Sequence, residues 1–280
     1  MSRAVLGFAA SLLLTLGVLA QEPAADSPAG RFGAAARRGD VAEVKRLLDA
    51  GVDVNTPFRY GATALFSACD RGHAEVVKLL LERGARTDIQ DTFYGATPFT
   101  WALGPASGDP TPAHVEIARM LLAKGAGSRT RVLASAAGGG NVAFLKLALE
   151  DKLPALDLGE ALEAATKQGH AEVVELLKGA GALPLPEANA AVERSLLEKY
   201  AGDYAGEGPR AFRFTVVLQE SGLAVRLGAD PVPLGAYDQR TFRTLKDPRL
   251  RMTFDPEGKS VAVKTPGGES VLKRSTGSQP

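Results

Sequence analysis

Residues 71–84, RGHAEVVKLLLERG, decide the fold, because closely similar segments recur along the chain. The others read RGDVAEVKRLLDAG (38–51), PAHVEIARMLLAKG (112–125), GGNVAFLKLALEDK (139–152) and QGHAEVVELLKGAG (168–181). In the first three along the chain, apolar residues lie four, seven and eight positions after a polar residue, as in Val77, Leu80 and Leu81 after His73. This spacing predicts a helix with one apolar stripe. So short a helix cannot bury its stripe alone, and neighbouring repeats must stack.

Glycine closes four of the five segments, at Gly51, Gly84, Gly125 and Gly181. Glycine adopts the left-handed backbone conformation that commonly ends a helix, at no steric cost. We therefore expect each of these glycines to have a positive φ and to end a helix.

A second pattern precedes the helices: Gly61-Ala-Thr-Ala-Leu65 recurs as Gly95-Ala-Thr-Pro-Phe99, and the two lie 34 residues apart. Threonine suits a helix N-cap and proline the first helical turn. With the glycine–histidine pairs and Gly51-Val-Asp-Val-Asn55, residues 30–184 resemble the ankyrin family, whose repeat is about 33 residues of turn plus two antiparallel helices. The resemblance implies a helical-repeat solenoid of about five repeats. Residues 104–112 form an insertion in the third repeat, and the fourth repeat is short enough to have lost its projecting turn.

The spacing of apolar residues changes after the last repeat from a helical period to alternation, beyond the prolines of Leu183-Pro-Leu-Pro186. A short helix is expected near residues 190–199. Alternating apolar residues then predict strands, which form a small antiparallel β domain, at 212–218, 223–227, 250–254, 260–263 and 269–272. Leu197-Glu-Lys-Tyr-Ala-Gly-Asp-Tyr204, Pro233-Leu234, Thr241-Phe242 and residues 254–258 resemble a lipocalin-like domain of unknown function that is attached to serine β-lactamase-like hydrolases. That resemblance implies no chemistry here, because the hydrolase domain is missing from this sequence.

The N-terminus has the layout of a secretory signal. Arg3 precedes the apolar run Ala4–Ala20, and polar residues follow. Val18 and Ala20 suit a cleavage site before Gln21, and the alternative is an uncleaved anchor. The expected organisation is a signal peptide (1–20), a linker (21–29), the ankyrin-repeat domain (30–184), a linker with a short helix (185–196), the β domain (197–275) and a disordered tail (276–280). The mature protein is expected to be periplasmic or secreted, without stable membrane insertion.

Composition excludes several classes of function. The 33 Lys and Arg residues nearly balance 32 Asp and Glu residues, and losing Arg3 with the signal leaves 32 against 32. A nucleic-acid partner is therefore not expected, because such binding normally relies on a basic excess. Cys69 is the single cysteine, which rules out an intramolecular disulfide and a cysteine-based metal site, and it is expected to be a buried thiol.

No catalytic, cofactor-binding or metal-binding residue is assigned. His73, His114 and His170 occupy one repeat position and are interpreted as structural. Ser270 and Lys273 match a Ser-x-x-Lys spacing but lie on an expected strand, where they would face opposite sides. The acidic residues of the helices are interpreted as solvated charges.

The candidate binding surface lies at the projecting turns and the first helices, which form the concave face of an ankyrin stack. Aromatic residues at two adjacent turns are unusual for solvated loops, and such rings supply much of the binding energy in interfaces. The candidate residues are Phe58, Arg59, Tyr60, Phe66, Asp70, Arg71, Phe93 and Tyr94. The alternative is that one ring of each pair packs against the neighbouring turn. Trp101 could belong either to the core or to the groove.

The sequence favours a non-enzymatic scaffold that binds a protein partner of unknown identity. A small apolar-ligand carrier is the alternative, through the lipocalin-like domain, as is an accessory module of a cell-envelope hydrolase system. The carrier is disfavoured because so short a β segment makes a barrel too small for a roomy cavity, since about eight strands are needed to hold one small ligand. The oligomeric state is not predicted.

Overall fold

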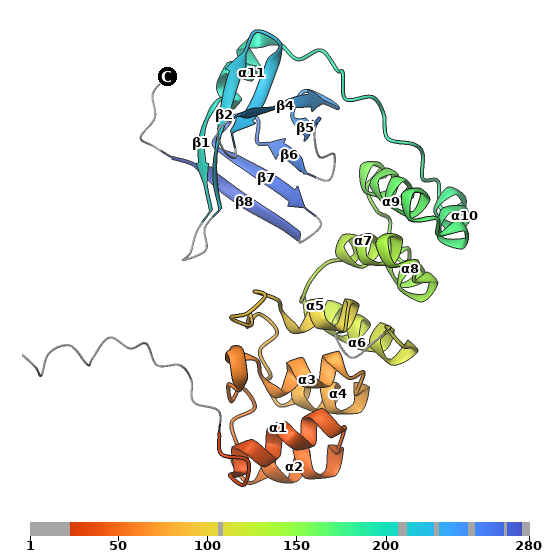
Figure 1. Cartoon of the computed structure of the whole chain (residues 1–280), viewed down its shortest axis with the longest axis vertical. Helices are drawn as coiled ribbons and strands as arrows, with labels where there is room; N and C mark the ends of the chain where they lie inside the picture. Colours follow the sequence, from red (N-terminus) through yellow and green to blue (C-terminus); the bar gives the residue numbers. More distant parts are fainter. Residues whose placement is uncertain are drawn as a thin grey trace, which may run out of the picture. The chain divides into compact units, whose positions relative to one another are not determined.

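A computed structural model describes residues 23–105, 109–206, 212–226, 230–245, 250–265 and 268–275 of the chain. Paired helices come first in the chain, and a closed β-barrel follows (Figure 1). The chain divides into two compact units, of which the first ends at Ser135 and the second begins at Ala136. The predicted signal peptide (1–20) and the predicted tail (276–280) lie outside the described residues.

Three helix pairs build the first unit. Their bounds are α1 (Pro28–Arg38), α2 (Val41–Asp49), α3 (Ala64–Asp70), α4 (Ala74–Glu82), α5 (Pro98–Leu103) and α6 (Pro112–Ala123). The first helices α1, α3 and α5 pack side by side, and the second helices α2, α4 and α6 do the same (Figure 1). Val44, Val77, Leu80, Ala118 and Leu121 are all fully buried. The predicted apolar stripes are thus confirmed as the contact faces of stacked repeats.

Helix α7 (Arg129–Gly139) spans the division between the units, and α8 (Val142–Ala148), α9 (Ala155–Gln168) and α10 (Ala171–Gly179) follow in the second unit. Only residues 124–128 separate α6 from α7, whereas residues 83–97 separate α4 from α5. The fourth repeat therefore lacks a long projecting turn, as its length predicts. The predicted helix near 190–199 is α11, which begins later, at Arg194, and ends at Tyr200.

The closing glycines have the predicted conformation. Gly51, Gly84, Gly125 and Gly181 have φ values of 90°, 83°, 75° and 85°. Each lies two residues past the end of its helix. A side chain at these positions would force a conformation that L-residues avoid.

The histidines link consecutive repeats within each unit. Nε2 lies 3.0 Å from the Arg37 carbonyl oxygen in His73, 3.3 Å from that of Asp70 in His114 and 3.1 Å from that of Gly138 in His170. Each ring also rests on a glycine one repeat earlier, since a Cβ atom at Gly39 would lie 2.7 Å from His73 Nδ1. The structural interpretation of the histidines is confirmed.

The second unit contains a closed antiparallel barrel in which every strand pairs with its sequence neighbours and β1 closes on β8. The strands are β1 (Gly202–Ala205), β2 (Arg213–Gln219), β3 (Gly222–Arg226), β4 (Pro231–Ala236), β5 (Thr241–Thr244), β6 (Arg251–Phe254), β7 (Ser260–Thr265) and β8 (Gly268–Arg274). The overall prediction of a helical-repeat solenoid followed by a small antiparallel β domain is confirmed.

The barrel has more strands than the alternation of apolar residues predicts. The alternation of apolar and polar residues predicted β2, β3, β6, β7 and β8 but did not predict β1, β4 and β5. Two of these have only four residues, and β4 contains two prolines and a glycine, which argue against a strand. The carbonyl oxygen of Pro233 nevertheless accepts a hydrogen bond from Leu245 N at 3.0 Å. Proline can make this bond because it requires an acceptor and no N–H donor.

Aromatic rings fill the barrel interior. Tyr200 is fully buried and stacks on Phe254, with ring centroids 4.6 Å apart. Phe254 also contacts Tyr204 and Phe242, at 5.8 and 5.6 Å. The Tyr204 hydroxyl lies 2.9 Å from the Tyr200 carbonyl oxygen, and burial raises its pKa to about 12. The strand number permits a ligand-holding barrel, but these rings make the interior a packed core.

Within the described part of the chain, no helix combines the length and apolar character needed to cross a bilayer.

Candidate functional site

A groove at the projecting turns of the first unit includes Tyr60, whose backbone conformation is strained. Tyr60 follows Arg59 in a short 3-10 turn (Arg59–Gly61) before α3 and has φ 59° and ψ 22°. Among the described residues it is the one non-glycine residue with a positive φ. The left-handed conformation costs an L-residue about 1–2 kcal/mol, and Gly or Asn would relieve that cost. Such strain often accompanies function.

Asp91 organises the neighbouring turn. Its Oδ1 accepts hydrogen bonds from Phe93 N at 3.0 Å and Tyr94 N at 2.5 Å. Its Oδ2 accepts from Ala96 N at 3.1 Å and from Trp101 Nε1 at 3.2 Å. The Asp91 residue is only 4% exposed. The carboxylate therefore fixes both the loop and the indole beneath it.

The two turns are joined, and their rings form a continuous row. Thr92 N donates to the Tyr60 carbonyl oxygen at 2.7 Å. Ring centroids are 5.1 Å apart for Tyr60 and Phe93, 4.6 Å for Phe93 and Tyr94, and 5.8 Å for Tyr94 and Trp101. Despite these contacts, Tyr60, Phe93 and Tyr94 remain 44%, 60% and 70% exposed. Solvent thus still covers much of a row of rings that hold one another in place.

A groove of about 330 Å³ runs beside this row. We call it the aromatic groove, and its walls are Arg59, Tyr60, Ala62, Phe66, Ser67, Asp70, Asp91, Phe93, Tyr94 and Trp101. The guanidinium of Arg59 lies over the Tyr60 ring, 4.7 Å from its centroid.

Six of the eight predicted surface residues line the aromatic groove, and two do not. Phe58 packs on α1, where a Cβ atom at Gly33 would lie 2.6 Å from its ring. Arg71 is absent from the walls, and its Nε lies 3.4 Å from Asp70 Oδ2. Phe66 borders the groove but is only 4% exposed, so it is mainly a core residue. Phe58 is therefore a packing residue, but its ring lies on helix α1 and not on the neighbouring turn.

Four wall residues were not predicted as binding residues: Ala62, Ser67, Asp91 and Trp101. Trp101, which sequence could not assign to core or groove, is partly buried and lines the groove. It lies 34 residues after Ser67, another wall residue, so the repeat spacing could have indicated it. Asp91 could have been found from its position two residues before Phe93, since aspartate commonly caps the backbone two residues further on.

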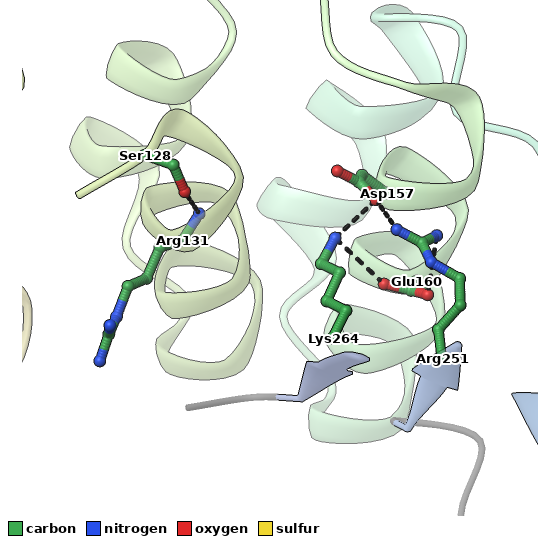
Figure 2. A network of polar contacts seen from close by, with 6 residues as sticks. All are labelled: Ser128, Arg131, Asp157, Glu160, Arg251 and Lys264. Carbon is green, nitrogen blue, oxygen red and sulfur yellow. Dashed lines mark hydrogen bonds and ion pairs between the residues drawn. The ribbon is translucent and has the colours of Figure 1, made fainter. Parts of the chain in front are cut away.

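A second polar cluster lies in the second unit (Figure 2). Asp157 of α9 contacts Arg251 of β6 and Lys264 of β7, the latter at 2.5 Å. Glu160, one turn along α9, lies 3.0 Å from Arg251 Nη1 and 3.5 Å from Lys264 Nζ. The Asp157 side chain is 5% exposed and that of Glu160 24%. The expectation that the acids of the helices are solvated was wrong for these two.

The two acids of this ion network differ in their pKa. Burial would raise the pKa of Asp157, but hydrogen bonds from Lys264 and Arg251 outweigh it and leave that pKa below its usual range. For Glu160, burial prevails over the nearby cations and raises the pKa. Two carboxylates face two cations, so the charges balance, and we interpret the cluster as structural.

Cys69 is fully buried, and burial raises the pKa of its thiol well above the usual range. A reactive thiolate is therefore not expected there. In the described residues no group of three or more histidine, cysteine or acidic side chains is placed to hold a metal ion.

Comparison with known proteins identifies the repeats. A family model described as ankyrin repeats (3 copies) matches residues 32–131. Ankyrin repeat, SAM and basic leucine zipper domain-containing protein 1 is similar to this chain, with 45% identity over 58 residues in Mus musculus and 46% over 58 residues in Equus caballus. Each match covers 21% of this chain, which spans only 12% of the relative's length. Residues 32–131, in the helical N-terminal part, are therefore an ankyrin-repeat region.

Proposed function

We propose that this chain is an exported, non-enzymatic scaffold that holds a protein partner in the aromatic groove. Ankyrin repeats are protein-interaction modules, which supports the general role. One observation carries the specific assignment: three neighbouring rings stay exposed, and one of them belongs to a residue in a strained backbone conformation. An exposed apolar cluster is favourable in a folded protein mainly where a partner covers it. The strained backbone of Tyr60 presents one of these rings at the groove.

The assignment is tested by removing the exposed rings without disturbing the fold. The double variant Tyr60→Asn and Tyr94→Ser should weaken capture of the partner at least tenfold, about 1.4 kcal/mol. Its melting temperature should stay equal or rise, because asparagine tolerates the left-handed conformation better than tyrosine. Quantitative pull-down from the exported fraction, paired with thermal melts, measures both effects.

Val41→Ser provides the control, because Val41 is 37% exposed on α2 and lies outside the groove walls. It should leave capture unchanged. Capture that survives in the double variant while the fold melts earlier would mean that the rings serve packing.

Export is the second part of the proposal and rests on the apolar run at Ala4–Ala20. Cleavage after Ala20 should leave Gln21 as the first residue of the mature, periplasmic or secreted protein. N-terminal sequencing of exported material checks this directly. Intact Met1 in a membrane pellet would show instead that the run is a retained anchor.

A further inference from the structure

The geometry points to a basic side chain, an arginine in an exposed segment of the partner, as the group that the aromatic groove receives. This inference rests on the proposed function and adds the chemistry of the partner. It depends on three properties of the walls: the ring faces, the placement of negative charge and an internal example of the same contact.

The rings supply the first property. The face of an aromatic ring carries partial negative charge and attracts a cation within about 6 Å of its centroid. Tyr60, Phe93, Tyr94 and Trp101 bring four such rings to one groove of about 330 Å³. Guanidinium groups stack on rings readily because they are planar and weakly hydrated.

The placement of charge supplies the second property. Asp91 is 4% exposed, and the four groups that donate to it are uncharged N–H groups, so its negative charge is held in the wall without being neutralised by them. Asp70 adds a second carboxylate to the walls. Arg59 and Arg71 oppose these charges, but Arg71 is 51% exposed and Arg59 is also exposed. Water and salt screen exposed charges more than buried ones. The buried charge of Asp91 therefore favours a cation in the groove.

Arg59 supplies the third property. Its guanidinium already lies 4.7 Å from the Tyr60 centroid. A ring of this row thus accepts a guanidinium from the chain itself. An arginine of the partner would make the same contact with the rings that Arg59 does not cover, with Asp70 within the same walls.

The experiment uses Trp101, the single tryptophan of the chain and a wall residue, so its emission reports occupancy of the groove. Three blocked pentapeptides that differ only in a central arginine, citrulline or glutamate are titrated against the mature chain. The arginine peptide should change the emission saturably and bind at least tenfold more tightly than the citrulline peptide, which has the same shape without the charge. Rising salt should weaken the arginine peptide selectively.

Asp70→Asn should weaken the arginine peptide and leave the citrulline peptide unchanged. Asp88→Asn is the matched control, because Asp88 is 69% exposed, pairs with Arg86 and lies outside the walls. Equal binding of the arginine and citrulline peptides, tighter binding of the glutamate peptide, or no saturable response to arginine would each overturn the inference. None of these results bears on the Tyr60 and Tyr94 capture test, which decides the proposed function separately.

Discussion

Replacing Phe254 by alanine is expected to lower the free energy of unfolding of the barrel by about 3–5 kcal/mol. Phe254 is 1% exposed and contacts the rings of Tyr200, Tyr204 and Phe242. Its removal leaves a cavity at the point where the three rings meet. Domains of this size have only about 5–15 kcal/mol of net stability, so the loss should bring the barrel close to unfolding.

Hydrogen exchange followed by mass spectrometry measures this loss strand by strand from β1 to β8. Phe212→Ala is the matched control, because Phe212 belongs to the same domain but is 46% exposed. It should cost less than about 1 kcal/mol. Trp101 emission follows the first unit independently. Equal losses in the two variants would contradict the account of a packed aromatic core.

Asp157→Asn is expected to destabilise the second unit by about 3–5 kcal/mol at neutral pH. Asparagine preserves the shape of the side chain but leaves Arg251 and Lys264 facing Glu160 as their remaining acid (Figure 2). Poorly compensated buried cations account for the loss. Chemical denaturation monitored by hydrogen exchange in α9, β6 and β7 measures it.

The pH dependence has a definite sign. Because the folded pKa of Asp157 is depressed, its contribution to stability is present above its unfolded pKa, about 3.9. That contribution is lost as the pH falls through the folded pKa. The difference between wild type and Asp157→Asn should therefore shrink below about pH 4.

Glu163→Gln is the control for this prediction, because Glu163 is an exposed acid on the same helix. It should change stability by less than about 0.5 kcal/mol. If Asp157→Asn changed the free energy of unfolding as little as this control, the ion network would contribute little to stability.

The helical repeats were predictable because the apolar residues of each stripe lie close together in the sequence and follow the helical period. Val77, Leu80 and Leu81 share a helix face wherever that helix lies, and the spacing of Gly51 and Gly84 gives the repeat length. The barrel was less predictable. Strand β4 contains Pro231 and Pro233 and shows no alternation of its own, and it is held as a strand by pairing with β3 and β5.

The candidate site was partly predictable for the same reason. Local sequence places Tyr60, Phe93 and Tyr94 at turns, and the repeat length brings the turns together. Sequence does not reveal that Phe58 folds back onto Gly33 or that Tyr60 has a positive φ, because both depend on the packing of the neighbouring helix and turn. The ion network joins residues 94 and 107 positions apart, which no local pattern pairs.

Site-specific photo-crosslinking from the aromatic groove tests directly whether a protein partner binds there. A photoreactive phenylalanine analogue at position 94 replaces a ring that is 70% exposed, and the same analogue at position 45 replaces Lys45, which is 60% exposed on α2. We expect one dominant adduct with a protein partner from position 94 and none from position 45. Equal adducts from both positions, or an adduct from position 45 alone, would contradict the assignment of the groove.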